Sequence, residues 1–240
     1  MGTRVTPFNP PPGYPRIKVV NSFDELVTTP FSGAANALCW QRTLPGNYCE
    51  VAEQLGGGDG MATLDESRLR TLSLSAAGQV AVEILLADQQ LLRTHGLAPI
   101  LDCIHGYPRD EDTEVVPIDV YSFHVDSAPV PTDTYLCSYT EAASEGLRND
   151  EARRRVDIPE TRAKLLKQFG GEDNGDFLEY LKENCYDLHY APVPEARPFS
   201  FGLGNLWRIA TEYPGSPVPP CIHRAPTTVP GRLPRLLLIS

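Results

Sequence analysis

The residues best suited to chemistry in this sequence are a histidine and an aspartate two positions apart, His124 and Asp126. Residues i and i+2 of a strand point to the same side, so one metal ion can bind both side chains. The pair alone decides little, because 5 histidines and 31 acidic residues among 240 produce a His-x-Asp/Glu pair about 0.65 times by chance. Its context therefore has to decide.

A second histidine, His223, lies about a hundred residues further on, in another short β-like stretch. Two imidazoles and one carboxylate on one face of an octahedral ion are typical of non-haem Fe(II) oxygenases, and they leave positions for a bidentate co-substrate and dioxygen. A 2-oxo acid co-substrate carries a second carboxylate, for which a buried guanidinium is a two-pronged partner. Arg232 and Arg235 follow His223 by about ten residues and meet that requirement.

With these residues the chain resembles the Fe(II)/2-oxoglutarate-dependent oxygenase superfamily, over roughly residues 100–240. The resemblance implies a double-stranded β-helix core, also called a jelly-roll or cupin-like core, behind N-terminal helices. It implies His124, Asp126 and His223 as the Fe(II) ligands and catalytic centre. It also implies Arg235 as the anchor of the distal carboxylate of 2-oxoglutarate.

Arg232 is the second choice for that anchor. Many members of the superfamily carry a serine two residues after this arginine, whereas Leu237 follows Arg235 and Pro234 follows Arg232. The sequence therefore departs from the pattern at the co-substrate. Asp126 is present at the position where the halogenase variant has a small residue, so the resemblance does not extend to halogenases.

The resemblance implies an iron- and dioxygen-dependent oxidoreductase. Its substrate would be a small polar molecule, such as an amino acid or an intermediate of natural product biosynthesis. The expected reaction is oxidation of an unactivated C–H bond, by hydroxylation, desaturation or cyclisation.

A different class of protein remains open, because the tripeptide Cys-Ile-His occurs twice. On adjacent strands, Cys103, His105, Cys221 and His223 could hold a zinc ion in a non-catalytic jelly-roll or cupin-like module. A third interpretation is structural: a buried His124 bonded to a neighbour, and Asp126 capping a bend. Trp207, on a predicted strand, is a candidate substrate contact that more often belongs to a core.

The elements that must position these residues indicate an α+β fold and a single oxygenase domain, 1–240. Residues 1–15 contain five prolines, which predicts an extended arm. Helical periodicity and capping signals predict a helical part over 16–98. Alternating, Thr- and Tyr-rich runs predict a β-helix core over 99–240, with a charged helical insertion at about 141–188. The insertion is a hypothetical lid that excludes water from the site.

The composition excludes two classes of partner. There are 21 Lys and Arg against 31 Asp and Glu, a net charge of −10, which argues against nucleic acid and anionic membranes. No apolar run approaches the roughly 20 residues that span a bilayer. Early prolines and the lack of an Asn-x-Ser/Thr site predict a cytoplasmic protein with reduced cysteines.

Overall fold

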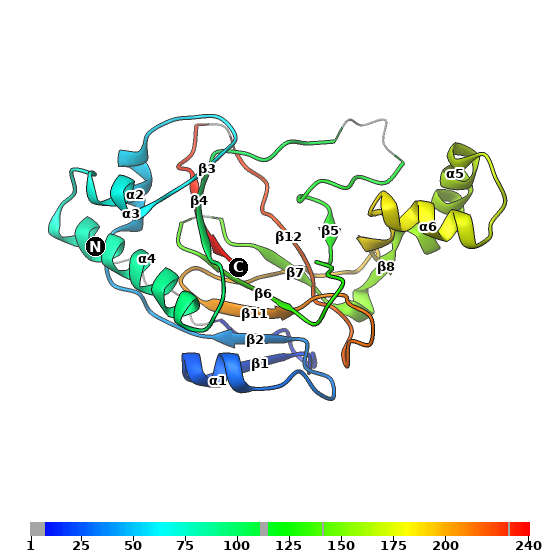
Figure 1. The fold of residues 1–240 in the computed structure, drawn as a ribbon, viewed down its shortest axis with the longest axis horizontal. Coiled ribbons are helices and arrows are strands. Elements are labelled where there is room, and N and C mark those ends of the chain that lie inside the picture. The colour runs from blue at the N-terminus through cyan, green and yellow to red at the C-terminus, as the bar shows by residue number, and fades with distance from the viewer. Residues whose placement is uncertain (1–7, 111–114, 141, 230) are drawn as a thin grey trace.

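The protein is described here from a computed structural model that covers residues 8–110, 115–140, 142–229 and 231–240 (Figure 1). Two β-sheets form its centre, with helices at both ends. The larger sheet has seven strands, which in spatial order are β1 (Ile17–Val20), β2 (Ala37–Trp40), β11 (Leu206–Ala210), β6 (Asp133–Ser138), β13 (Arg235–Ile239), β4 (Ile100–Ile104) and β3 (Met61–Thr63).

The smaller sheet has six strands. In spatial order they are β10 (Phe199–Ser200), β7 (Glu145–Leu147), β12 (Ile222–Arg224), β5 (Phe123–His124), β9 (His189–Pro192) and β8 (Ala152–Arg154). Strands far apart in the chain pair antiparallel: β13 with β4 and β6, and β12 with β5 and β7. The chain thus passes back and forth between two antiparallel sheets, as in a jelly-roll-like sandwich. The predicted combination of helices with a jelly-roll-like core is confirmed at that level.

Four helices pack on the outer face of the larger sheet. They are α1 (Phe23–Thr28), α2 (Tyr48–Leu55), α3 (Glu66–Arg70) and α4 (Ala76–Thr94). Capping signals in the sequence are matched at two of them, because the hydroxyls of Ser22 and Ser75 accept the amides of Glu25 and Gly78 at the N-termini of α1 and α4. Buried leucines of α4 pack against alternate residues of β4 and β13, such as Leu101.

The N-terminal part differs from the helical prediction for 16–98, because it also supplies β1, β2 and β3. These strands have three or four residues, too few for a period of two to stand out in the sequence. The predicted arm, 1–15, is described from residue 8 onward. Phe8 and Tyr14 are buried in the core between the sheets, where Phe8 meets Trp207 edge-on at 4.8 Å, so this part is packed into the fold.

The predicted insertion, 141–188, contains both a core strand and the expected helices. β7 lies within it and pairs with β12, so the excursion begins after β7; its residues, 148–198, carry the helices and also add β8 and β9 to the smaller sheet. The sequence hides this strand because it has three residues and a central glycine. Gly146 lets Phe199 pack directly on the backbone, where a Cβ atom would meet the ring at 2.3 Å.

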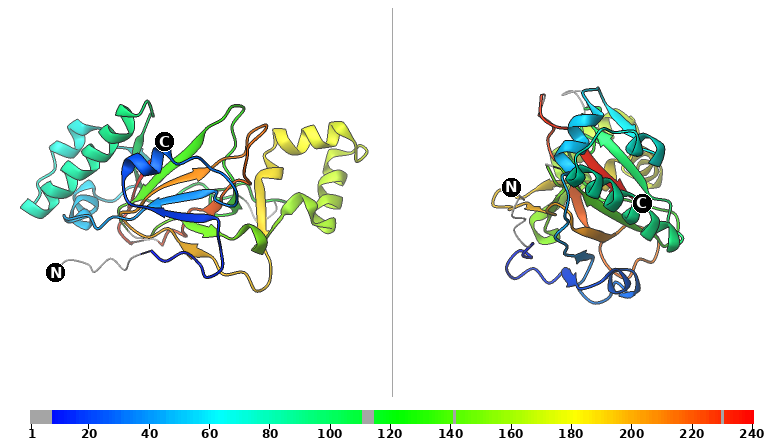
Figure 2. Two further views of the ribbon diagram at one scale, coloured as in Figure 1. Left: turned by 90° about the horizontal axis from the view of Figure 1, so that it is seen from below. Right: turned by 90° about the vertical axis from the view of Figure 1, so that its left-hand side faces the viewer.

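The excursion carries α5 (Pro159–Phe169) and α6 (Gly175–Glu183), with three 3₁₀ turns, η1 (Asn149–Glu151), η2 (Arg155–Asp157) and η3 (Tyr186–Leu188). The two helices share a small hydrophobic cluster of their own, around Leu165, Phe177 and Leu181. Figure 2 shows them beyond the sheets, at the opposite end from α2, α3 and α4. In the described part of the chain, no helix is long and apolar enough to cross a membrane.

Candidate metal centre

Two neighbouring strands of the smaller sheet bring the predicted histidines together. His124 on β5 lies directly opposite His223 on β12, and the ring centroids are 4.6 Å apart. Asp126 follows β5 by two residues. One ligand atom from each of the three side chains lies within 4.8 Å of the others, so one metal ion can bind all three.

Backbone contacts orient both imidazoles for metal binding. Nδ1 of His124 lies 2.7 Å from the carbonyl oxygen of Ser122, and Nδ1 of His223 lies 3.3 Å from that of Cys221. A carbonyl oxygen only accepts hydrogen bonds, so each Nδ1 carries the proton and each Nε2 keeps its lone pair. This is the tautomer that binds a metal through Nε2.

The charge states of His124 and Asp126 also suit a cation. Burial, with His223 close by, lowers the pKa of His124 to about 4, so its ring is neutral near pH 7. Burial alone would raise the pKa of Asp126, but the facing imidazoles and a hydrogen bond from Thr134, at 2.5 Å, lower it overall. Neutral imidazole and ionised carboxylate are the forms that bind metal ions.

Arg235 lies on the inner face of β13 and is buried. Its guanidinium donates to the hydroxyls of Ser138 at 3.0 Å, Ser144 at 2.6 Å and Tyr107 at 3.2 Å, while Nε has no hydrogen-bond partner among the described residues. Burial lowers the pKa of Arg235. A buried cation whose hydrogen-bond partners among the described residues are neutral hydroxyls has no counter-charge among these partners, and an anionic ligand would supply one.

One strand of the larger sheet connects the two features. On β6, Thr134 donates to Asp126 and Ser138 accepts from Arg235. These positions are four residues apart on the same face of the strand, roughly 13 Å at a rise of about 3.3 Å per residue. The candidate metal ligands and the guanidinium of Arg235 therefore lie near opposite ends of β6, in the space between the two sheets.

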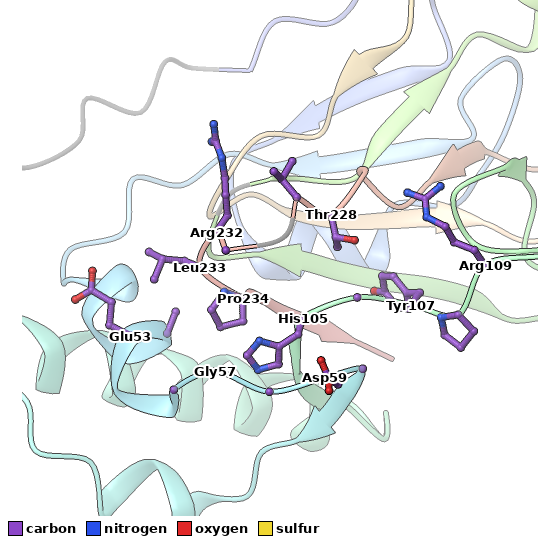
Figure 3. Close-up of a pocket in the computed structure, with 18 residues that line it drawn as sticks. Glu53, Gly57, Asp59, His105, Tyr107, Arg109, Thr228, Arg232, Leu233 and Pro234 are labelled. Atoms are coloured by element: carbon purple, nitrogen blue, oxygen red, sulfur yellow. The ribbon is translucent and has the colours of Figure 1, made fainter.

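Arg232 has a different environment from Arg235. It is exposed, on the loop before β13, and it borders a cavity of about 1070 Å³ together with His105 and Tyr107 (Figure 3). The three metal-binding side chains do not border this cavity. A smaller cavity of about 190 Å³ is lined by His124, Asp126 and His189, so it adjoins the candidate metal ligands.

The structure contradicts the zinc alternative. Cys103 faces the helices on the outer side of the larger sheet, whereas Cys221 lies in the core between the sheets. In the described residues, the metal-binding group formed by His223 includes His124 and Asp126, and neither cysteine nor His105 belongs to it. The two Cys-Ile-His tripeptides lie on different sheets, and each strand turns its cysteine to a different layer of the fold. Their side chains therefore do not meet at one metal ion.

Trp207 is a core residue, not a substrate contact: it is 1% exposed, and its indole stacks on Phe201 at 4.3 Å. Sequence reasoning also missed residues that the fold places at the site. These are Tyr107, Ser138, Ser144 and His189. None has a local signal, because their contacts arise between strands distant in the chain.

No protein-family model matches the chain, and no curated protein matches its sequence. The fold is similar to solved structures of the Kdo hydroxylase KdoO, described as a non-heme Fe(II) alphaketoglutarate dependent dioxygenase. The cobalt(II) complex is 12% identical over 93% of this chain and 88% of that chain, with a TM-score of 0.38. The complex with alphaketoglutarate and Fe(III) is also 12% identical, over 93% and 87%, with a TM-score of 0.37.

These proteins belong to the class that the sequence resemblance indicated. At 12% identity the function of this chain has to be argued from its own site.

Proposed function

We propose that the chain is a non-haem Fe(II)/2-oxoglutarate-dependent dioxygenase, with the eight strands β4–β7 and β10–β13 forming a double-stranded β-helix. The observation that carries the proposal is the cluster of His124, Asp126 and His223, with both Nδ1 atoms bonded to backbone carbonyls and both Nε2 atoms available. These three side chains would hold Fe(II) and leave the rest of its coordination shell to other ligands.

In this proposal Arg235 binds the distal carboxylate of 2-oxoglutarate. Its support is the buried guanidinium, held by the hydroxyls of Ser138, Ser144 and Tyr107 without a carboxylate among these contacts. Hydroxyls from β6, from the residue before β7 and from the loop after β4 would thus serve where Leu237 offers none.

When bound, Fe(II) with 2-oxoglutarate supplies the oxidation of a C–H bond by dioxygen, with succinate and carbon dioxide as co-products. The side chains of this protein hold and orient the reactants. The cavity of about 190 Å³ beside His124 and Asp126 is bordered by the apolar residues Ile118, Val120 and Leu188, which limit water there. Its size favours a small substrate, and the proposed outcome is hydroxylation, desaturation or cyclisation.

The test is an anaerobic Fe(II) titration with and without 2-oxoglutarate, read by the metal-to-ligand charge-transfer band of the chelate. We expect one Fe(II) per chain, and a band that requires 2-oxoglutarate. His124→Ala and His223→Ala should each abolish stoichiometric binding, because each removes one of three ligands. Cys103→Ser is the matched control and should bind normally. Full iron retention in both histidine variants would overturn the proposed function.

A further inference from the structure

The row of residues that contains the two metal-binding histidines continues across the smaller sheet. His223 lies opposite His124, and His124 lies opposite His189 on β9. Arg154 on β8 lies opposite Tyr190, and the next residue, Arg155, begins η2 beside the end of this pairing, one position from the level of His189 on β9. Residues opposite one another in adjacent strands share a face of the sheet.

Strand spacing places this row within reach of a small ligand at the metal. Adjacent strands lie about 4.8 Å apart, so the backbone of β8, from which Arg155 continues, lies about 10 Å from that of β5, with β9 between them. The ring of His189 is 5.7 Å from that of His124 and borders the same 190 Å³ cavity.

The two members of the row beyond His124, which are His189 and Arg155, have polar atoms without partners among the described residues. His189 is 5% exposed, and its Nδ1 has no hydrogen bond among the described residues; the same holds for Nε of the half-buried Arg155. Burial lowers the pKa of Arg155. A half-buried guanidinium whose Nε has no hydrogen-bond partner among the described residues is stabilised by an anionic ligand.

Other charges near His189 are already engaged. Asp110 and Asp119 act electrostatically on it, but both are acceptors within their own loop. Asp110 accepts the amides of Ile118 and Asp119, and Asp119 accepts those of Tyr121 and Ser122. Arg154, the neighbour of Arg155, is paired with Glu212. Among the described residues, Arg155 is thus the cation near His189 that has no ion pair.

We propose that Arg155 and His189 bind a carboxylate group of the substrate beside the metal centre. This rests on the proposed function, which it deepens by naming an acidic small molecule as the substrate. The carboxylate would receive charge-assisted hydrogen bonds from the guanidinium and a hydrogen bond from the neutral ring. The row would then order its occupants across the sheet, with the metal at one end and the substrate anion at the other.

The test uses propionate as the probe and propionamide as its uncharged isostere, added to protein saturated with Co(II) and 2-oxoglutarate. Paramagnetic relaxation of the propionate methyl protons, against a Zn(II) control, reports binding near the metal. We expect this relaxation in the wild type, at least tenfold weaker propionate binding in Arg155→Gln, and partial recovery in Arg155→Lys. Propionamide should bind at least tenfold more weakly. The control Arg153→Gln removes an exposed arginine of the same segment and should bind as the wild type.

Stability provides a second measurement. Arg155→Gln removes an unpaired, half-buried cation, so the melting temperature should stay the same or rise. A fall of several degrees would show that Arg155 serves the fold and would overturn the proposal. Unchanged propionate binding in Arg155→Gln would do the same. So would a raised 2-oxoglutarate requirement in that variant, because the arginine would then serve the co-substrate.

Saturation-transfer measurements on metal-free protein separate this proposal from the proposed function. If Co(II) does not bind at His124 and His223 but propionate still binds through Arg155, the metal assignment fails and the anion subsite stands. If Co(II) and 2-oxoglutarate bind but propionate does not, the oxygenase stands and the subsite is wrong.

Discussion

His124 and His223, the proposed metal ligands, are oriented by the same kind of backbone contact on two strands. In each, Nδ1 faces the carbonyl oxygen of the residue two positions earlier, Ser122 for His124 and Cys221 for His223. Asp126 is held differently, by the hydroxyl of Thr134 on the opposite sheet. The carboxylate is therefore the ligand whose position depends most on another part of the chain.

Thr134→Val tests that contact. The substitution removes the hydrogen bond to Asp126 but keeps the shape of the side chain, so Fe(II) affinity should fall by about 10- to 100-fold, as expected for a partner behind a metal ligand. Affinity is measured by anaerobic titration. Thr132→Val, on an exposed neighbour, is the control and should bind as the wild type. Equal affinity in Thr134→Val would show that Asp126 needs no such support.

Arg235→Leu tests the co-substrate anchor. Loss of charge-assisted hydrogen bonds worth about 1.5–3 kcal/mol should raise the 2-oxoglutarate requirement by a factor of ten or more. Fe(II) binding without 2-oxoglutarate should not change. The measurement is a 2-oxoglutarate titration of the charge-transfer band. Arg232→Leu is the control, and a loss of 2-oxoglutarate binding in Arg232→Leu alone would identify Arg232 as the anchor.

At the level of elements, α5 and α6 form a unit with its own small core, separate from the cores of the two sheets. This small core also includes Val116, from the segment before β5, and a segment with a core of its own can open separately from the rest. A lid function remains a prediction. It requires first that α5 and α6 can open without unfolding the two sheets.

Phe177→Ala should reveal that independence. Phe177 is fully buried among Leu165 and Leu181, so its truncation should cost about 3–5 kcal/mol locally. Amide hydrogen exchange should then accelerate in α5 and α6 and stay unchanged in β4, β6 and β13. Leu178→Ala, at a side chain 48% exposed, is the control with little effect. Faster exchange throughout the sheets would mean that the excursion unfolds together with the core.

At the level of the whole molecule, a buried ion pair joins the helical layer to the larger sheet. Arg42, after β2, contacts Asp88 of α4 at 2.6 and 2.8 Å, and Asp88 also accepts from the hydroxyl of Tyr139. Both charged side chains are less than a tenth exposed. Removing one partner therefore leaves a buried charge uncompensated.

Arg42→Leu should lower the free energy of unfolding by about 3–5 kcal/mol, because it strands the carboxylate of Asp88. Denaturant-induced unfolding measures the change. The control is Glu83→Gln, which breaks the exposed pair with Arg70 and should cost less than about 1 kcal/mol. A loss as small as the control's in Arg42→Leu would show that Asp88 is satisfied by Tyr139 alone.

The sequence predicted the features that depend on neighbouring residues. The i, i+2 spacing of His124 and Asp126, the caps at Ser22 and Ser75, and the period of α4 are local patterns, and the structure contains them. It mispredicted the extent of the excursion and missed the N-terminal strands, because strands of three or four residues carry too little periodicity.

The sequence alone determined which residue types were available for a metal site, because ligand chemistry and strand alternation are local properties. Only the tertiary structure decided that His223 lies opposite His124, that hydroxyls from β6 and the start of β7 surround Arg235, and that His189 and Arg155 extend the histidine row. The physical reason is register. A shift of one residue in the pairing of distant strands would turn each of these side chains to the other face of its sheet.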